Sequence, residues 1–275
     1  MTEGYSALLE SAAWLDLDAR GRMVARGRDR ARLLHNLTTN EVKKMNLGDA
    51  CYAFLLNPQG RIQADLHLLC LADHFLIDTD AGLREKVQQS IRRYIIADQV
   101  ELEDVTAQTA SLGVEGPKAE ELKPAIGDYT IAPFTVTGQP GYRIYCTKDS
   151  KPALIRQLES LGARPATEHD ARTVRIENGK PLYGEDIRDT NLPQETQQMQ
   201  AISFTKGCYL GQEIVERIRA QGHVNKKLER LELEGSEPPA AGTKLQVGGR
   251  DAEITSSVYS PNLRKVVALA YVRAA

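Results

Sequence analysis

A proline–glycine turn between two strand-like segments is the feature of this sequence that most restricts its fold. The turn is Asn57-Pro58-Gln59-Gly60, in which proline presets φ and glycine is free to take a positive φ. Cys51 to Leu56 precedes it, and Arg61 to Leu71 follows with apolar and polar side chains in alternation. Alternation places one face of a strand in a core, so the sequence predicts a pair of strands that belongs to a larger antiparallel sheet.

Further strand and helix patterns surround this pair in an order typical of an α+β fold. The expected strands are Ala13–Asp18, Arg22–Ala25 as its hairpin partner, His74–Asp78 and Gln99–Val105. One helix is expected after Asp29, a reasonable N-cap, and another from Leu83 to Ile96. The order predicts an antiparallel sheet with helices on one face. Residues 110–175 repeat the mixture, and their last helix is expected to be capped by Thr167 with Asp170.

The character of the chain changes after Asn225, where no helical period remains. Short strand patterns there are separated by turn signals at Pro238–Gly242 and Gly248-Gly249, which is typical of a compact β-barrel of about 50 residues. We therefore expect three units. They are an N-terminal α/β lobe at 1–106, a second α/β lobe at 107–224 and a C-terminal β-barrel at 225–275.

Charge and cysteine usage exclude several classes of protein. The formal net charge of −2 gives no general attraction to nucleic acid or to an anionic membrane. The N-terminus lacks the pattern of a secretory signal, and no apolar run approaches the roughly 20 residues of a membrane span. We therefore expect a cytoplasmic protein. The four cysteines form no C-x-x-C pair, so the sequence predicts neither a zinc knuckle nor a dithiol redox motif, and we expect no metal site. We also expect a monomer.

The most unusual local sequence is Lys206-Gly207-Cys208-Tyr209-Leu210-Gly211-Gln212-Glu213. It precedes a helical stretch, Gln212 to Gln221, that Gly222 is well placed to end. A thiol near the start of a helix feels the positive end of the helix dipole, and Lys206 adds a cation, so both favour a reactive thiolate at Cys208. The alternative is a buried structural cysteine whose neighbouring glycines only allow a tight turn.

A second notable stretch runs from Arg175 to Glu195 and crowds carboxylates, a tyrosine and arginines into one loop. The carboxylates of Asp186 and Glu195 suit a ligand with adjacent N–H donors, and the ring of Tyr183 suits a planar heterocycle. The alternative is a well-capped surface loop.

Together these two segments resemble the folate-binding proteins of iron–sulfur cluster assembly and repair, which are linked to tRNA modification. The resemblance rests on their K-G-C-[FY]-x-G-Q-E signature at Lys206–Glu213, and it extends over nearly the whole chain. These proteins are relatives of the glycine-cleavage T-protein, an aminomethyltransferase. The resemblance implies a ring of two α/β lobes with antiparallel sheets plus a small C-terminal β-barrel, with tetrahydrofolate in the central opening.

The resemblance also implies roles for particular residues. Tyr183, Asp186 and Glu195 would lie near the pterin, Arg175 or Arg217 would meet the glutamate tail of folate, and Lys206 would belong to the same site. Cys208 matches the signature cysteine.

One departure from the transferases concerns a pair of acids. Where they carry G-x-I-x-D-D-L, this chain has Gly60-Arg61-Ile62-Gln63-Ala64-Asp65-Leu66. Asp65 is the acid that remains. The loss of the other acid makes aminomethyl transfer less expected.

Three functions follow as hypotheses. The first is a tetrahydrofolate-binding accessory protein that uses Cys208 to support iron–sulfur client enzymes and, through them, tRNA modification. The second is a folate-dependent aminomethyl (one-carbon) transferase that uses Asp65. The third is a thiol switch or interaction protein with no ligand. A cluster usually takes four ligands, so Cys208 alone could not hold one without cysteines from a partner.

Overall fold

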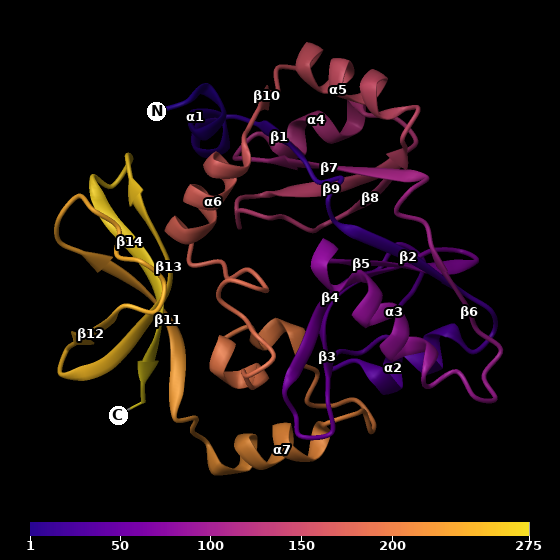
Figure 1. Cartoon of the computed structure of the whole chain (residues 1–275). Helices are drawn as coiled ribbons and strands as arrows, with labels where there is room; N and C mark the ends of the chain where they lie inside the picture. The colour runs from indigo at the N-terminus through magenta and orange to yellow at the C-terminus, as the bar shows by residue number, and fades with distance from the viewer. Residues whose placement is uncertain (275) are drawn as a thin grey trace.

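The computed structural model describes residues 1–274 and shows three β-sheet units arranged in a ring (Figure 1). Two α/β lobes lie one above the other, and the C-terminal sheet lies beside them (Figure 1). The chain between α6 and α7 runs through the space among the three units. The expected α+β class, with antiparallel sheets in two lobes and a C-terminal β unit, is confirmed.

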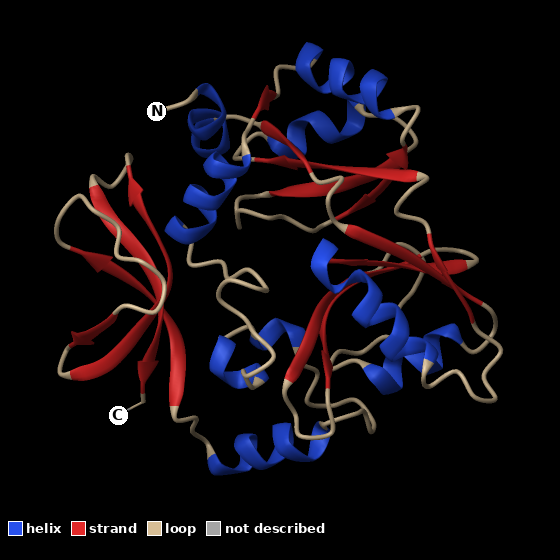
Figure 2. Cartoon of the chain, viewed as in Figure 1, coloured by secondary structure: helices blue, strands red, loops and turns tan. Residues whose placement is uncertain are grey.

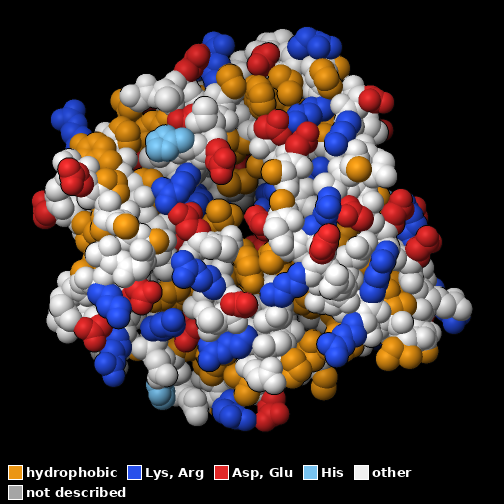
Figure 3. Space-filling view, viewed as in Figure 1, with side chains coloured by type: hydrophobic (Ala, Val, Ile, Leu, Met, Phe, Trp, Pro, Cys, Tyr) orange, Lys and Arg blue, Asp and Glu red, His pale blue; other side chains and the backbone are white. Residues whose placement is uncertain are grey.

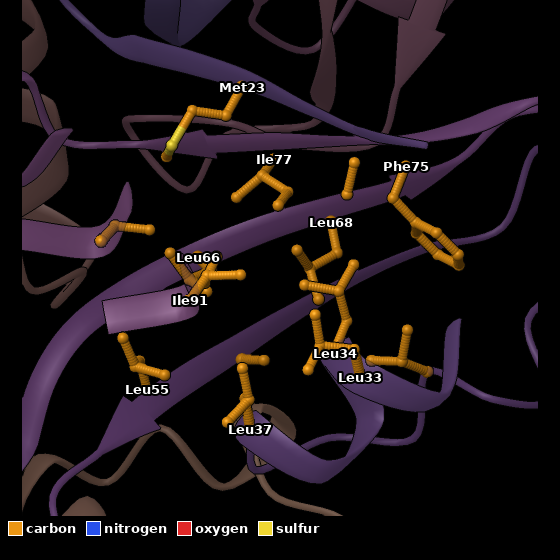
Figure 4. Packing of buried hydrophobic residues seen from close by; sticks show 14 of the residues in the cluster. Met23, Leu33, Leu34, Leu37, Leu55, Leu66, Leu68, Phe75, Ile77 and Ile91 are labelled. Atoms are coloured by element: carbon orange, nitrogen blue, oxygen red, sulfur yellow. The ribbon is translucent and has the colours of Figure 1, made fainter. Parts of the chain in front are cut away.

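The first lobe is a five-stranded antiparallel sheet with the order β3-β4-β5-β2-β6. Its strands are β2 (Gly21–Arg26), β3 (Ala50–Leu56), β4 (Ile62–Cys70), β5 (His74–Thr79) and β6 (Glu101–Asp104). One face is covered by α2 (Arg30–Leu37) and by α3 (Arg84–Arg92), which follows the short turn η1 (Ala81–Leu83) (Figure 2). Leu34 and Ile91 of these helices meet Leu66, Leu68 and Ile77 of the strands in the core (Figure 4).

The second lobe is a five-stranded sheet with the order β10-β1-β7-β9-β8, antiparallel except for the pair β1–β10. Its strands are β1 (Ala13–Asp16), β7 (Thr109–Glu115), β8 (Thr130–Ala132), β9 (Gly141–Thr147) and β10 (Arg164–Pro165). Its helical segments are α1 (Glu3–Glu10), α4 (Ala119–Leu122), η2 (Lys123–Ala125), α5 (Lys151–Ser160) and α6 (Glu168–Glu177). The predicted cap of α6 is confirmed, because Thr167 and Asp170 form a reciprocal capping box.

The third unit is a curled, open sheet with the order β11-β14-β13-β12. Its strands are β11 (Lys226–Leu233), β12 (Lys244–Val247), β13 (Arg250–Ser260) and β14 (Lys265–Arg273). The edge strands β11 and β12 do not pair with each other within residues 1–274, so the expected barrel is a half-barrel. Helix α6 packs on it through Ile176, which joins Leu228, Val258 and Leu269 in one apolar cluster.

The connecting segment between α6 and the half-barrel contains η3 (Pro193–Thr196), η4 (Met199–Ala201) and α7 (Gln212–Gln221). Its apolar side chains, Tyr209 and Val215 among them, pack against Phe54 of the first lobe. Gly222 ends α7 with a φ of 76°, as the sequence predicts. The longest helices, α7 included, have 10 residues, and in the described chain no helix has the length and apolar composition needed to cross a membrane.

Two further expectations about elements are wrong, and one helix was not expected. Strand β1 does not form a hairpin with β2, because β1 pairs with β7 and β10 of the second lobe whereas β2 pairs with β5 and β6. Two apolar strands with a short connection are typical of a hairpin. Here, however, the chain passes from the sheet of the second lobe to that of the first between the two strands. The helix expected up to Ile96 ends at Arg92. No helix was expected at Glu3–Glu10, where α1 lies.

The inner faces of the two lobes meet at a buried polar cluster centred on Asp78 of β5. Its carboxylate accepts hydrogen bonds from Arg20 Nε at 2.5 Å, from Arg143 Nη1 at 2.8 Å and from the Tyr145 hydroxyl at 2.9 Å. Burial by itself raises the pKa of Asp78, but the two guanidinium groups outweigh burial and hold this pKa below its ordinary value. Because Arg143 and Tyr145 belong to β9, this ionised cluster joins the lobes.

We predict that Asp78→Asn destabilises the protein by about 3–5 kcal/mol, because it leaves the buried guanidinium group of Arg143 and the largely buried one of Arg20 without their carboxylate. The matched control is Glu120→Gln, which removes the exposed ion pair with Lys123 and should change stability by less than about 0.5 kcal/mol. Urea unfolding followed by circular dichroism measures both. Equal effects of the two substitutions would show that the Asp78 cluster does not hold the lobes together.

Candidate active site in the central pocket

A cavity of about 170 Å³ lies where the inner faces of the two lobes approach each other. The first lobe lines it with Tyr52, Asp65 and His67, and the second lobe with Phe134 and Arg143. The connecting segment closes it with residues 180–182 and with two glutamines, Gln198 and Gln200. The space-filling view is hollowed near its centre, among the three units (Figure 3). Side chains distant in sequence therefore converge on one enclosed space.

Asp65 is the one predicted site residue that lines this pocket. It is 7% exposed, and its Oδ2 accepts a hydrogen bond of 3.1 Å from the hydroxyl of Tyr52. Its Oδ1 is buried and has no hydrogen-bond partner within residues 1–274. Burial raises the pKa of Asp65, against an opposing effect of Arg20. The carboxyl can thus accept a hydrogen bond from a ligand N–H, or hold a proton for it.

Alternation along β4 explains why Ala64 does not affect this pocket. Ala64, Leu66 and Leu68 belong to the core beneath the helices, while Asp65 and His67 point to the other face and line the cavity. The position where the transferases carry a second acid therefore faces the core of the first lobe, and the acid on the pocket side is present.

His67 presents a fixed donor to the same pocket. Its ring lies 4.5 Å from the ring of Phe134 and 5.0 Å from that of Tyr52, measured between centroids. Arg20 Nη2 is 3.2 Å from its Nδ1, and since arginine only donates, Nδ1 accepts and the proton of the neutral ring is on Nε2. Burial, aided by Arg143 and Arg20, lowers the pKa of His67 well below its ordinary value, so the ring is neutral.

Lys180 brings an ammonium group to the pocket from the connecting segment. Its Nζ donates to the carbonyl and to the hydroxyl of Thr135, which belongs to the second lobe. Burial lowers the pKa of Lys180 to about 8, although Glu115 opposes this effect. Neither Lys180 nor His67 was among the predicted site residues.

The predicted loop residues have mainly structural partners. Asp186 is fully buried and binds Arg175 at 2.7 Å, Thr255 at 2.6 Å and Ser256 at 2.6 Å, so it ties α6 and the loop to the half-barrel. The Tyr183 hydroxyl donates to the carbonyl of Gln63 at 3.0 Å, beside Asp65. None of the predicted residues Arg175, Tyr183 and Asp186 lines the central pocket.

Two other predicted residues lie elsewhere. Glu195 caps η3 through the backbone N–H of Leu192, and it lines a separate cleft of about 830 Å³ against the half-barrel. Arg217 is exposed on α7, where it pairs with Glu213 at 3.0 Å. Neither lines the central pocket.

Lys206 and Cys208 have opposite environments although they are two residues apart. The Lys206 ammonium is buried and donates to the carbonyls of His35, Thr38 and Asn40 at 2.5, 2.6 and 2.7 Å. It is therefore an anchor between the signature segment and the end of α2. Cys208 is exposed and does not line the central pocket, so the alternative of a buried structural cysteine is wrong.

Sequence reasoning could have found His67 but not the rest of the pocket. His67 follows Asp65 by two positions, which places both on one face of a strand. Arg20, Phe134 and Lys180 come from segments 40 or more residues away from β4, and nothing local marks them as neighbours of Asp65.

The chain is similar to known proteins along nearly its whole length. Residues 1–131 match the family model of the GCVT N-terminal domain. An aminomethyltransferase from Rubrobacter xylanophilus is 30% identical over 98% of this chain and 78% of its own length. One from Geobacillus kaustophilus is 28% identical over 99% of this chain and 82% of its own length.

The fold has a solved counterpart as well. The crystal structure of glycine cleavage system aminomethyltransferase T from Bartonella henselae superposes with a TM-score of 0.89 at 19% identity, covering 98% of this chain and 81% of that one. This likeness concerns the fold, and the sequence relationship to the Rubrobacter protein carries the family assignment. The chain therefore belongs to the aminomethyltransferase family and is a relative of the glycine-cleavage T-protein.

Proposed function

We propose that the protein binds tetrahydrofolate in the central pocket and transfers a one-carbon unit to it, as a folate-dependent aminomethyltransferase. The observation that carries this proposal is the buried, unpartnered Oδ1 of Asp65 at the wall of the pocket. The names of the relatives favour transfer over the accessory role that the cysteine signature suggests.

The residues of the pocket suit one end of a folate. A cavity of about 170 Å³ is smaller than the roughly 300–1,000 Å³ of a complete ligand site, so it would enclose only part of the molecule. Tyr52, His67 and Phe134 offer ring faces and edges to a planar heterocycle. Asp65 Oδ1 offers the acceptor that a ring N–H requires, and burying this oxygen without a partner costs about 1–3 kcal/mol.

Tetrahydrofolate supplies the nitrogen that accepts the one-carbon unit, and the chain supplies orientation and proton handling. Asp65 holds an N–H of the ligand or a proton at Oδ1, which its raised pKa favours. Tyr52 fixes the carboxyl by donating to Oδ2. Ala64 in place of a second acid made aminomethyl transfer less expected. This argument loses its force because Ala64 belongs to the core, while Asp65 is retained on the pocket side of β4.

A second candidate function rests on Cys208. The thiol is exposed, lies outside the central pocket, and is held in a loop whose neighbours Lys206 and Tyr209 are both buried. An anchored loop that presents one free thiol supports the accessory role in iron–sulfur cluster assembly or repair, with client enzymes as partners. This role does not need Asp65, so the two candidates can be separated by mutation.

We predict that the protein binds one equivalent of tetrahydrofolate and forms methylene-tetrahydrofolate from an aminomethyl donor. Asp65→Asn should lower turnover by about 10²-fold or more, because it removes the proton-holding group but keeps the shape of the side chain. Asp128→Asn, at an exposed acid remote from the pocket lining, is the matched control and should leave turnover unchanged.

Anaerobic calorimetry and a coupled absorbance assay measure binding and turnover separately. No heat of binding at high tetrahydrofolate concentration would overturn the folate site. Binding with unchanged turnover in Asp65→Asn would remove this residue from the mechanism.

For the accessory role, we predict that Cys208→Ala leaves purified transferase turnover unchanged. The same variant should lower the activity of iron–sulfur enzymes in cells under oxidative stress to the level of a strain lacking the gene. Cys146→Ala, at a half-buried thiol of β9, is the control and should complement fully. Normal iron–sulfur enzyme activity in the Cys208→Ala strain would exclude the accessory role.

A further inference from the structure

His67 brings to the central pocket a hydrogen-bond donor whose place on the ring is fixed. Arg20 Nη2 lies 3.2 Å from Nδ1 of His67 and can only donate, so the proton of the neutral ring is on Nε2. Nε2 points away from Arg20 and has no acceptor within residues 1–274. The guanidinium group of Arg20 is in turn bound by Asp78 at 2.5 Å. The fold therefore holds an Nε2–H donor at the wall of the pocket.

Asp65 brings a hydrogen-bond acceptor to the same wall. Asp65 and His67 are two positions apart on β4, so their side chains leave the same face of the strand, with Cα atoms about 7 Å apart. The Tyr52 hydroxyl donates to Oδ2 of Asp65, which leaves Oδ1 as a buried acceptor without a partner. One strand thus presents an acceptor next to a donor, and neither group is used by the protein itself.

A ligand that satisfies both groups must carry a donor next to an acceptor. The reduced heterocycle of tetrahydrofolate has such an edge, because its ring N5–H and its C4 carbonyl oxygen project side by side. We propose that Asp65 and His67 recognise this edge, Oδ1 accepting from N5–H and Nε2–H donating to the carbonyl, and that Arg20 is the positioning residue that fixes the His67 donor. This inference rests on the proposed function, because it assigns the orientation of the ligand in the same pocket.

The arrangement makes His67 a specificity residue. An amino group at C4 is a donor and cannot accept a hydrogen bond from Nε2–H, so a heterocycle with this group leaves the histidine donor without a partner. A site built to make a hydrogen bond rejects a ligand that lacks the matching group, because a buried polar group is then left unpaired.

A histidine that only packs between aromatic rings makes a different prediction. The His67 ring lies 4.5 Å from the Phe134 ring and 5.0 Å from the Tyr52 ring, so a substitution could weaken the binding of every ligand through packing. Packing alone does not distinguish a carbonyl from an amino group of similar size. The ratio of two affinities, compared between the wild type and a variant, therefore isolates the hydrogen bond.

The first experiment is anaerobic calorimetric titration of the full chain with tetrahydrofolate and with tetrahydroaminopterin, which carries an amino group in place of the C4 carbonyl. The wild-type protein should prefer tetrahydrofolate by at least about tenfold. His67→Met should abolish this preference, whereas His67→Gln, whose amide N–H reaches the place of Nε2, should retain most of it. His223→Met, at an exposed histidine outside the pocket lining, is the control and should keep the full preference.

The second experiment tests Arg20 through the protonation of the His67 ring. Nitrogen-15 NMR should show the Nε2–H tautomer in the wild-type protein and in Arg20→Lys, which keeps a cationic donor. Arg20→Met should shift the ring towards the Nδ1–H tautomer and lower the preference for the carbonyl. An Nδ1–H tautomer in the wild-type protein overturns the proposal without any variant, and an unchanged tautomer in Arg20→Met removes Arg20 from it.

The outcomes separate this inference from the proposed function. Binding of tetrahydrofolate without a preference over tetrahydroaminopterin, or with a preference that His67→Met leaves unchanged, overturns the role of His67 while the folate site stands. Loss of the preference only in Lys180→Met, at the ammonium that also lines the pocket, has the same consequence. A preference that depends on His67 in a protein that forms no methylene-tetrahydrofolate supports the recognised edge and overturns the transfer. No binding of either ligand overturns both.

Discussion

The ion cluster around Asp78 is the interaction on which the central pocket depends. Asp78 is fully buried on β5, and its partners Arg143 and Tyr145 are on β9, so one carboxylate fixes the distance between two sheets that share no strand. Buried charges stabilise a fold only when each of them is paired. The guanidinium groups of Arg20 and Arg143 are accordingly oriented toward Asp78. Arg20 then holds one tautomer of His67, so the same carboxylate determines what the pocket offers a ligand.

The fold was predictable wherever a local pattern corresponds to a local cause. Alternation identified β4, the Thr167–Asp170 box identified the start of α6, and Gly222 identified the end of α7. Strand pairing was less predictable, because it depends on contacts distant in sequence. The pairing of β1 with β7 and β10 instead of β2 is the clearest case, because no local pattern within residues 13–26 indicates that the chain passes from one lobe to the other there.

The site was predictable to a smaller extent for the same reason. Asp65 was identified through the resemblance to the transferase pattern, and the turn and the alternating strand around it, which are both local, predict which face of β4 it lies on. The carboxylates of the loop from Arg175 to Glu195 suggested a ligand site. In the folded protein the Asp186 carboxylate instead accepts hydrogen bonds from Arg175, Thr255 and Ser256, and so connects α6 to the half-barrel. A polar side chain in a sequence shows which bonds it can make, whereas the fold decides whether a ligand or the protein makes them.

The positions of Ala64 and Cys208 explain how one fold can keep its pocket while its family motifs change. Ala64 is buried in the core of the first lobe, where alanine fills the space without a polar group that needs a partner. Cys208 is exposed in a loop that Lys206 anchors to three carbonyls, so a thiol there requires no change in the core. The side chain of Ala64 is on the opposite face of β4 from Asp65, and Cys208 does not line the pocket. The chemistry of the pocket and that of the thiol can therefore vary independently on the same scaffold.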